Sequence, residues 1–152
     1  MIDSKQLDEY TKHPELAFEN LGQVLDLLES TDETEVNCVS DLLENCGAPR
    51  LDDAAFLTEQ LKSAQSPRVY WCSTLLGRLG SNCGGPEARS RIQAALCQAT
   101  INDCLELSAR ERAVWAIGEL GSIDSDCRDV LKTQVEAAPA RLKRLLETAL
   151  AT

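Results

Sequence analysis

Seven cysteines and a single histidine are the residues of this 152-residue chain best suited to metal or redox chemistry. The thiols are Cys38, Cys46, Cys72, Cys83, Cys97, Cys104 and Cys127. No two of them form a CxxC pair, and His13 is followed by Pro14. Because structural zinc sites usually place ligands in closely spaced pairs, the spacing predicts no metal and no cofactor. Most of the thiols are expected to be small core residues; the alternative is a redox role for Cys83, which lies in a glycine-rich turn.

The sequence also gives little indication of residues for acid–base or nucleophilic catalysis. The carboxylate pairs Asp52-Asp53 and Asp124-Asp126 fall at expected helix starts, where they satisfy backbone N–H groups and the helix dipole. A Ser-His-Asp set would have to use His13, which is expected in a loop. Neither GxxxxGK[ST] nor GxGxxG occurs. The sequence therefore predicts no catalytic residue and no enzyme activity.

Aromatic residues and arginines are the best candidates for binding a partner. Trp, Tyr and Arg are enriched at the energetic centres of protein interfaces. The candidates in this chain are Tyr70, Trp71, Arg78 and Trp115. For Trp115, packing between neighbouring helices is the favoured alternative. For Trp71, which follows Tyr70 directly, an inward and an outward orientation are both open.

The charge is concentrated in one half of the chain. The formal net charge is −10, and residues 1–66 hold 15 acidic and 4 basic residues. An acidic surface repels phosphate backbones, which argues against nucleic acid as a ligand. The same asymmetry indicates a protein partner, with a basic one favoured for the acidic half. The oligomeric state is not specified by the sequence.

Targeting and membrane signals are not evident. The first ten residues contain no basic region followed by an apolar stretch, so they do not read as a signal peptide. The longest run without charge is Ile92 to Asn102, well short of the roughly 20 apolar residues that a spanning helix needs. We expect a cytoplasmic protein without a membrane span.

The elements that must carry these residues are helical. Apolar residues recur at three- and four-residue steps almost throughout, and no stretch alternates with a period of two. The predicted helix pairs lie at 34–64, 67–99 and 109–137. Helices before Ser30 and a final helix over 139–150 are expected to cap the ends, so the whole of 1–152 is read as one domain. Ser108 with Glu111 is predicted to form a capping box.

The sequence contains an internal repeat, which relates the predicted helix pairs to one another. Residues 75–81 match residues 116–122 at an offset of 41, and residues 39–47 match 72–80 more weakly. Periods of this size are typical of helical solenoids. In each strong copy one glycine ends the helix (Gly80, Gly121), as Gly47 does in the weak copy. A second glycine lies inside the helix (Gly77, Gly118), which predicts close approach of a neighbouring helix.

The helix Arg-Ala-Val-Trp-Ala-Ile-Gly-Glu-Leu-Gly at 112–121 resembles the first helix of a HEAT-like repeat of the bilin-lyase type. Residues 69–80 resemble it with larger or more polar side chains at the alanine positions. The resemblance extends over about 66–137, is weaker over 34–64 and is absent before Ser30. It implies an all-α, right-handed superhelix of about three HEAT-like pairs, and many members of this class are scaffolds or protein-binding modules.

Some HEAT-like proteins are enzymes, which leaves alternatives to a non-enzymatic interaction module. The hydroxylases hold iron with His-Glu pairs, which one histidine cannot supply. The DNA glycosylases use a basic groove with aromatic residues; a small version would draw on Arg68, Arg78, Arg89, Arg91, Tyr70 and Trp71. A lyase would need a chromophore cleft. The remaining alternative is an acidic binder that covers a basic partner with residues 1–66.

Overall fold

The computed structural model describes residues 2–151, and the regular elements in that range are all helical, without a strand. At the N-terminal end lie α1 (Ser4–Lys12) and α2 (Leu21–Asp26), with 3₁₀ helices at Pro14–Asn20 and Leu27–Glu29. The rest of the chain forms α3 (Glu33–Asn45), a 3₁₀ turn at Leu51–Asp53, α4 (Ala54–Gln60), α5 (Ser66–Arg78), α6 (Pro86–Ile101), α7 (Leu107–Glu119), α8 (Ser125–Gln134) and α9 (Ala140–Leu150).

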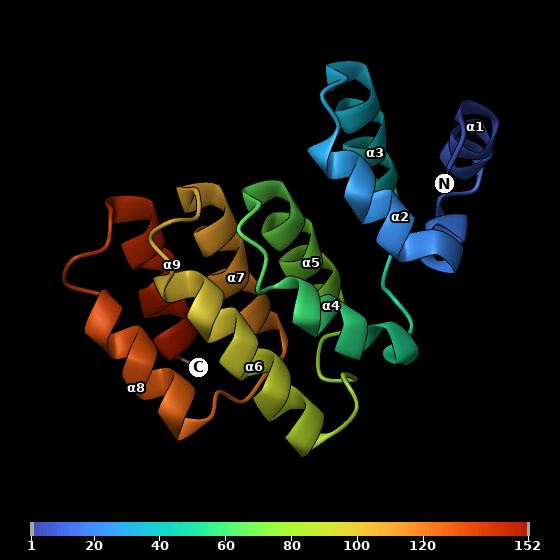
Figure 1. Ribbon diagram of the computed structural model, residues 1–152. Coiled ribbons are helices and arrows are strands. Elements are labelled where there is room, and N and C mark those ends of the chain that lie inside the picture. Colours follow the sequence, from blue (N-terminus) through green and yellow to red (C-terminus); the bar gives the residue numbers. More distant parts are fainter. Residues whose placement is uncertain (1, 152) are drawn as a thin grey trace.

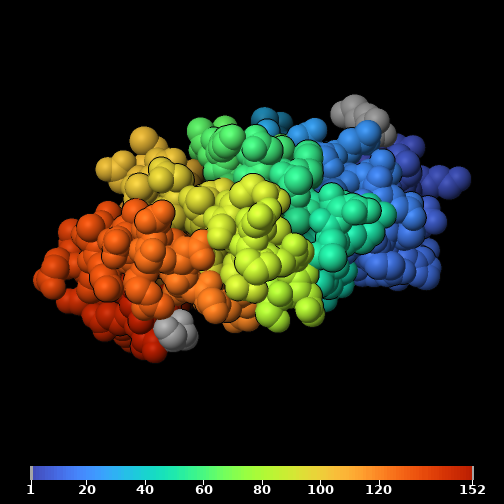
Figure 2. Space-filling model, turned by 90° about the horizontal axis from the view of Figure 1, so that it is seen from below, coloured from blue at the N-terminus to red at the C-terminus, as the bar shows by residue number. Residues whose placement is uncertain are grey.

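The helices stack in two rows. One row contains α5, α7 and α9, and the other contains α4, α6 and α8 in front of it (Figure 1). From below, the chain runs in order from one end of an elongated molecule to the other (Figure 2). The sequential stacking of helix pairs confirms the expected all-α repeat superhelix, in which each pair buries its apolar face against its neighbours.

The core follows from the periodicity of small and branched aliphatic residues. Leu75 and Leu76 of α5, Ile117 of α7 and Leu131 of α8 are all fully buried. Five of the seven cysteines are buried as well, which agrees with the expectation that most thiols serve as small core residues. Alanine at positions 109, 113 and 116 keeps the face of α7 thin, so the neighbouring helices approach closely.

Glycines end the helices where the repeat pattern predicts. Gly47, Gly80 and Gly121 have φ of 80°, 59° and 98°, a left-handed conformation that residues with a Cβ rarely adopt. The chain leaves α3, α5 and α7 at these three points. The predicted C-terminal glycines are therefore confirmed.

The start of α7 differs from the prediction. The helix begins at Leu107 with Glu106 as its N-cap, so Ser108 lies inside the first turn and cannot form a capping box with Glu111. A residue that is distant in the sequence fixes the start of α7 instead, because the Glu106 N–H donates to the Ser66 hydroxyl over 2.8 Å. This bond joins the first turns of α5 and α7 and leaves the Glu111 side chain free for another role.

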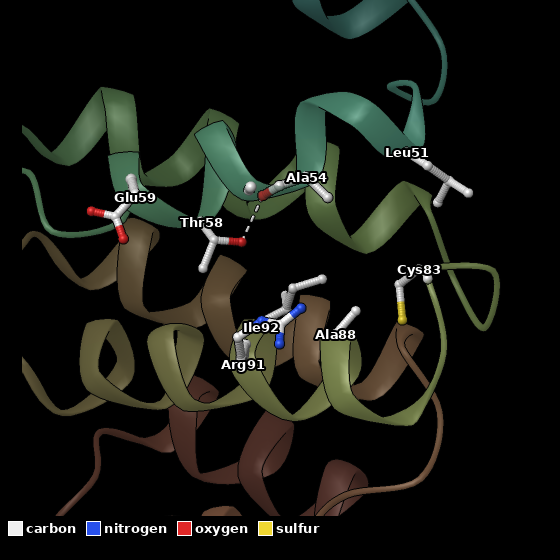
Figure 3. Close-up of a pocket in the computed structure, with 10 residues that line it drawn as sticks. Leu51, Ala54, Thr58, Glu59, Cys83, Ala88, Arg91 and Ile92 are labelled. Atoms are coloured by element: carbon white, nitrogen blue, oxygen red, sulfur yellow. Dashed lines mark hydrogen bonds between the residues drawn. The ribbon is translucent and has the colours of Figure 1, made fainter.

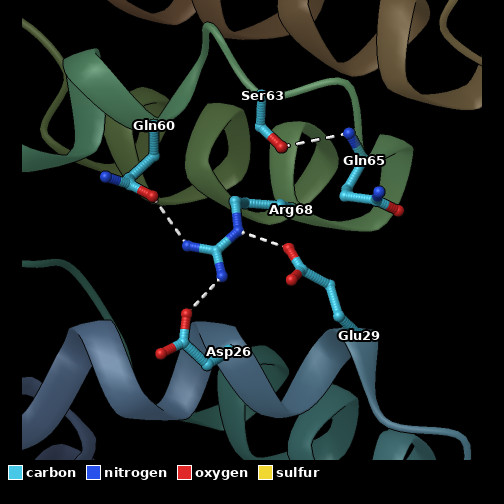
Figure 4. A network of polar contacts seen from close by, with 6 residues as sticks. All are labelled: Asp26, Glu29, Gln60, Ser63, Gln65 and Arg68. Atoms are coloured by element: carbon cyan, nitrogen blue, oxygen red, sulfur yellow. Dashed lines mark hydrogen bonds and ion pairs between the residues drawn. The ribbon is translucent and has the colours of Figure 1, made fainter.

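A buried arginine joins the acidic N-terminal helices to the repeats. Arg68 of α5 donates to Glu29 (2.8 Å), to Gln60 (2.6 Å) and to Asp26 (2.5 Å), as Figure 4 shows. Its side chain is 8% exposed, whereas those of Asp26 and Glu29 are 70% and 39% exposed. Burial acts to lower the pKa of Arg68, but hydrogen bonds to the two carboxylates outweigh it and raise the pKa. The guanidinium therefore stays charged inside the fold.

Arg78, one of the four predicted partner-binding residues, has a structural role within the chain. Its guanidinium donates to the backbone carbonyls of Leu43 (2.8 Å), Gly47 (3.0 Å) and Glu44 (3.2 Å). Leu43 and Glu44 lie in the last turn of α3, where carbonyls lack partners within the helix, and Gly47 lies in the turn that follows it. The side chain of α5 thus caps the helix of the preceding pair.

Substituting Arg78 with alanine is expected to destabilise the chain by about 1–2 kcal/mol, because several carbonyls lose a charged donor and the α3 C-terminus loses a favourable cation. Urea unfolding followed by circular dichroism measures this loss. Arg91→Ala, which removes an exposed arginine of α6, is the matched control and should change stability by less than about 0.5 kcal/mol. Equal stability of the two variants would contradict the capping role.

None of the helices described over residues 2–151 combines the length and the apolar character needed to cross a bilayer.

Candidate functional site

Two of the four predicted binding residues come together on the row formed by α5, α7 and α9. Tyr70 of α5 and Trp115 of α7 both line a hollow of about 270 Å³, together with residues of α9. Both side chains are half-buried. The hollow is bounded by Tyr70, Ser108, Glu111, Arg112, Trp115, Arg141 and Leu145.

Trp71 is not part of this surface. It is 8% exposed and packs edge-on against the Tyr70 ring, with ring centroids 5.2 Å apart. Consecutive residues of a helix point about 100° apart, so only one of the two aromatic rings can face outward. The Trp71 side chain points into the core. This corrects its prediction as an exposed partner-binding residue.

Trp115 packs against the helix-interior glycine of the preceding repeat. A Cβ built on Gly77 would lie 2.5 Å from Cζ3 of Trp115, closer than real Cβ atoms come. The close approach predicted at Gly77 is therefore confirmed, and so is the packing role of Trp115. The same prediction is wrong for Gly118, where no described neighbouring atom lies within 4 Å of such a Cβ, because no large side chain fills that position.

Arg112 sits between the two aromatic rings. Its guanidinium carbon lies 4.8 Å from the centroid of the Tyr70 ring and 4.8 Å from that of Trp115. Its Nη2 donates to the Tyr70 hydroxyl over 2.7 Å. Cations within about 6 Å of an aromatic face are attracted to it, most strongly where water is partly excluded. The rings therefore hold the arginine in one orientation at the rim of the hollow.

A second charged pair lies beside it. Nε of Arg141, on α9, is 3.3 Å from Oε2 of Glu111 on α7, and their side chains are 78% and 12% exposed. Oε2 is buried and makes no hydrogen bond of good geometry, so the contact is ionic. We call Tyr70, Glu111, Arg112, Trp115 and Arg141 the aromatic–arginine cluster. With two arginines and one glutamate, it is a positively charged spot in the half of the chain that carries almost no net charge.

The cluster combines a pre-oriented cation with apolar contact area. Aromatic rings supply contact area at low cost in side-chain entropy, and a guanidinium presents donors in a planar fork that matches carboxylates. Leu145 adds an aliphatic wall to the same hollow. This arrangement suits recognition of a surface that pairs a carboxylate with an apolar side chain.

A different hollow, of about 320 Å³, lies between α4 and α6 (Figure 3). Ala54, Ala88 and Ile92 form its apolar sides, with Leu51, 56% exposed, at its edge. Glu59 and Arg91 are the charged residues of its lining. Thr58 uses its hydroxyl to donate to the Ala54 carbonyl over 2.7 Å, so that polar group is occupied within α4. Pre-oriented donors of the kind seen in the aromatic–arginine cluster are not found in this lining.

Most of the thiols are buried in the core, and among the described residues they do not gather into a metal-binding group. Across residues 2–151, no group of three or more potential metal-ligating side chains is close enough to hold an ion. Burial raises the pKa of Cys72 to about 12 and also raises that of Cys46, despite the nearby charges of Arg68 and Arg78. Cys83, 1% exposed, lies in the wall of the α4–α6 hollow. The exposed thiol is Cys104.

Three members of the cluster were not identified from the sequence: Glu111, Arg112 and Arg141. One signal was present, since Arg112 and Trp115 are three residues apart and must share a helix face. Glu111 contacts Arg141 of α9, and Arg112 contacts Tyr70 of α5, because of the way the repeats stack in space. The sequence pattern had instead placed Glu111 in a capping box with Ser108.

Comparison with known proteins shows a similarity in the C-terminal part of the chain. Residues 109–148, which span α7 to α9 and most of the cluster, match the family model described as PBS lyase HEAT-like repeat. The searches of curated proteins and of solved structures gave no significant match. The matched segment is therefore similar to a HEAT-like repeat, and it lies within a stack of helix pairs of the kind that such repeats form.

Proposed function

We propose that this chain is a non-enzymatic protein-interaction module that binds its partner through the aromatic–arginine cluster. The observation that carries the proposal is the position of Arg112, held between two rings at 4.8 Å from each, at the edge of a hollow open to solvent. The HEAT-like repeat supports the class, because such helical modules often serve in protein interaction.

The chemistry of the cluster favours a partner segment that carries a carboxylate next to an apolar side chain. Arg112 uses Nη2 for Tyr70, and the fork geometry of a guanidinium leaves it suited to a second acceptor. Arg141 is largely exposed and can move from Glu111 to a partner's carboxylate. An apolar side chain would occupy the hollow against Leu145 and Trp115. The proposal assigns no reaction to the chain.

Replacing Arg112 with alanine is expected to weaken binding at least tenfold, or about 1.4 kcal/mol, because truncating a central arginine removes both charge and contact area. The partner is first recovered by affinity purification from the native host at moderate salt with the wild-type chain as bait. Its affinity for each purified variant is then measured by calorimetry. Arg112→Lys should restore only part of the affinity, since lysine keeps the charge but not the planar fork.

The matched control is Arg91→Ala, which removes an exposed arginine from α6, in the other row of helices. Both variants are checked by thermal unfolding, so that a change in affinity is separated from a change in stability. A partner that binds Arg112→Ala and Arg91→Ala with wild-type affinity would contradict the proposal.

A second candidate is a basic partner at the acidic end. A hollow of about 600 Å³ is bounded by Ile2, Gln23, Asp26, Leu27, Glu29, Ser30, Thr31 and Glu35. Asp26 is 70% exposed although it also contacts Arg68, so it retains accessible charge. Binding at this site would weaken steeply with salt and on Glu35→Gln, and would not respond to Arg112→Ala.

A further inference from the structure

Two thiols that are 30 positions apart in the sequence meet between α6 and α8. Sγ of Cys127 donates to Sγ of Cys97 over 3.2 Å. The residues are 6% and 3% exposed and lie in adjacent helices of the same row. They contribute to the lining of a hollow of about 260 Å³, together with Ala94, Gln98 and Val130.

Hydrogen bonds between α6 and the segment that starts α8 hold the two thiols opposite each other. Gln93, one turn before Cys97 on α6, is fully buried. Its Nε2 donates to the Ser122 carbonyl over 2.5 Å, and its Oε1 accepts from the Asp124 N–H over 3.1 Å. These bonds fix the segment that starts α8, and so place Cys127, in the first turn of α8, opposite Cys97.

We propose that Cys97 and Cys127 form a redox-active dithiol that a small peroxide oxidises to an intramolecular disulfide, locking α6 to α8. A peroxide is the oxidant of choice because the sulfurs border a small hollow and are otherwise buried, which excludes a large disulfide reagent such as oxidised glutathione.

The hydrogen bonds distinguish the two sulfurs: Sγ of Cys97 accepts from Sγ of Cys127, and it donates to the Cys127 carbonyl over 3.6 Å. The bond from Cys127 lowers the pKa of Cys97 against the effect of burial, whereas donating that bond, together with burial, raises the pKa of Cys127. A thiolate is the reactive form, so Cys97 is the attacking sulfur and Cys127 the resolving one.

The reaction balances with hydrogen peroxide alone. The Cys97 thiolate attacks one peroxide oxygen, the S–O bond forms as the O–O bond breaks, and the hydroxide released takes the thiol proton to leave as water. Cys127, on losing its proton, then attacks the Cys97 sulfur; the S–S bond forms, the S–O bond breaks and a second water leaves. Two thiols are oxidised by two electrons and one peroxide is reduced to two waters.

The test is intact-mass and peptide mapping of the full chain, reduced and then treated with stoichiometric hydrogen peroxide. Cys104→Ser is used as the parent, because Cys104 shares the tryptic peptide 92–110 with Cys97. We expect a mass loss of two hydrogen atoms, a cross-link between peptides 92–110 and 113–128, and reversal by dithiothreitol. The midpoint of thermal unfolding should rise by roughly 5–10 °C, because the disulfide constrains the unfolded chain.

Single variants separate the two roles in the same background. Cys127→Ser should accumulate a Cys97 sulfenic acid that dimedone traps, and Cys97→Ser should give neither the cross-link nor dimedone labelling at Cys127. Oxidised glutathione should modify the exposed Cys104 of the wild-type chain and leave the pair reduced. A Cys104→Ser parent in which Cys97 and Cys127 both stay reduced after peroxide treatment, or a Cys127→Ser variant without a trapped Cys97, would overturn the proposal.

Discussion

Gly77→Leu is expected to destabilise the chain by about 3 kcal/mol, more than any single core truncation of one methyl group. The new side chain would have to occupy space already filled by the Trp115 ring, since even its Cβ would lie 2.5 Å from Cζ3. Leucine is the better helix former by about 1 kcal/mol, so the loss reports steric conflict and not propensity. Urea unfolding of wild type and variant gives the difference in free energy of unfolding.

Gly118 is the matched control for that substitution. It occupies the equivalent position in the repeat, is also inside a helix, and has open space around a built Cβ. Gly118→Ala should therefore stabilise the chain by about 0.5–1 kcal/mol, whereas Gly77→Ala should destabilise it. Adding Trp115→Leu to Gly77→Leu should recover part of the loss. Two glycine variants with the same sign of effect would refute the packing of Trp115 on Gly77.

Removal of both carboxylates around Arg68 is expected to have a comparable effect. In Asp26→Ala/Glu29→Ala the guanidinium, 8% exposed, keeps Gln60 as its one remaining side-chain acceptor in the network. We expect the free energy of unfolding to fall by about 3 kcal/mol, because a buried charge is left without its counter-ions. This value is at the low end for such a loss, since the two acids are partly exposed and screened by solvent. Arg68→Met should lose less, about 1–2 kcal/mol, because the freed carboxylates regain water.

The control for the double variant is Asp8→Ala/Glu9→Ala, which removes two exposed acids from α1. It changes the net charge by the same amount and should shift the free energy of unfolding by less than about 0.5 kcal/mol. A similar loss in both double variants would mean that overall charge, and not the Arg68 network, sets stability. Guanidinium chloride is unsuitable because it screens the ion pairs, so urea is the denaturant to use.

The helices were predictable because their signals are local. Apolar periodicity and terminal glycines lie within about a dozen residues of each other, and α5 to α9 follow them closely. The start of α7 is an exception. The Ser108–Glu111 pattern satisfies the capping rule, yet a hydrogen bond to Ser66, 40 positions before Glu106, fixes where the helix begins. A tertiary contact there overrides a local signal of about 1 kcal/mol.

The proposed binding surface was only half predictable, for a physical reason. Tyr70 and Trp115 stand out by residue type, but an arginine becomes part of a site only when the stacking of repeats places rings on both sides of it. Arg78 shows the converse, because its type suggested binding and its position made it the cap of α3. Contacts between repeats decide both outcomes, and they depend on how helices superpose in space.

Site-specific photocrosslinking in the native host shows whether a partner binds at the aromatic–arginine cluster. A photoreactive residue at Ser108, exposed at the rim of the hollow, is compared with one at Thr133, exposed on α8. We expect one protein to be cross-linked from position 108 and none from position 133, and the product should be lost when Arg112→Ala is added. The same product from both positions, or a product unaffected by Arg112→Ala, would contradict binding at the cluster.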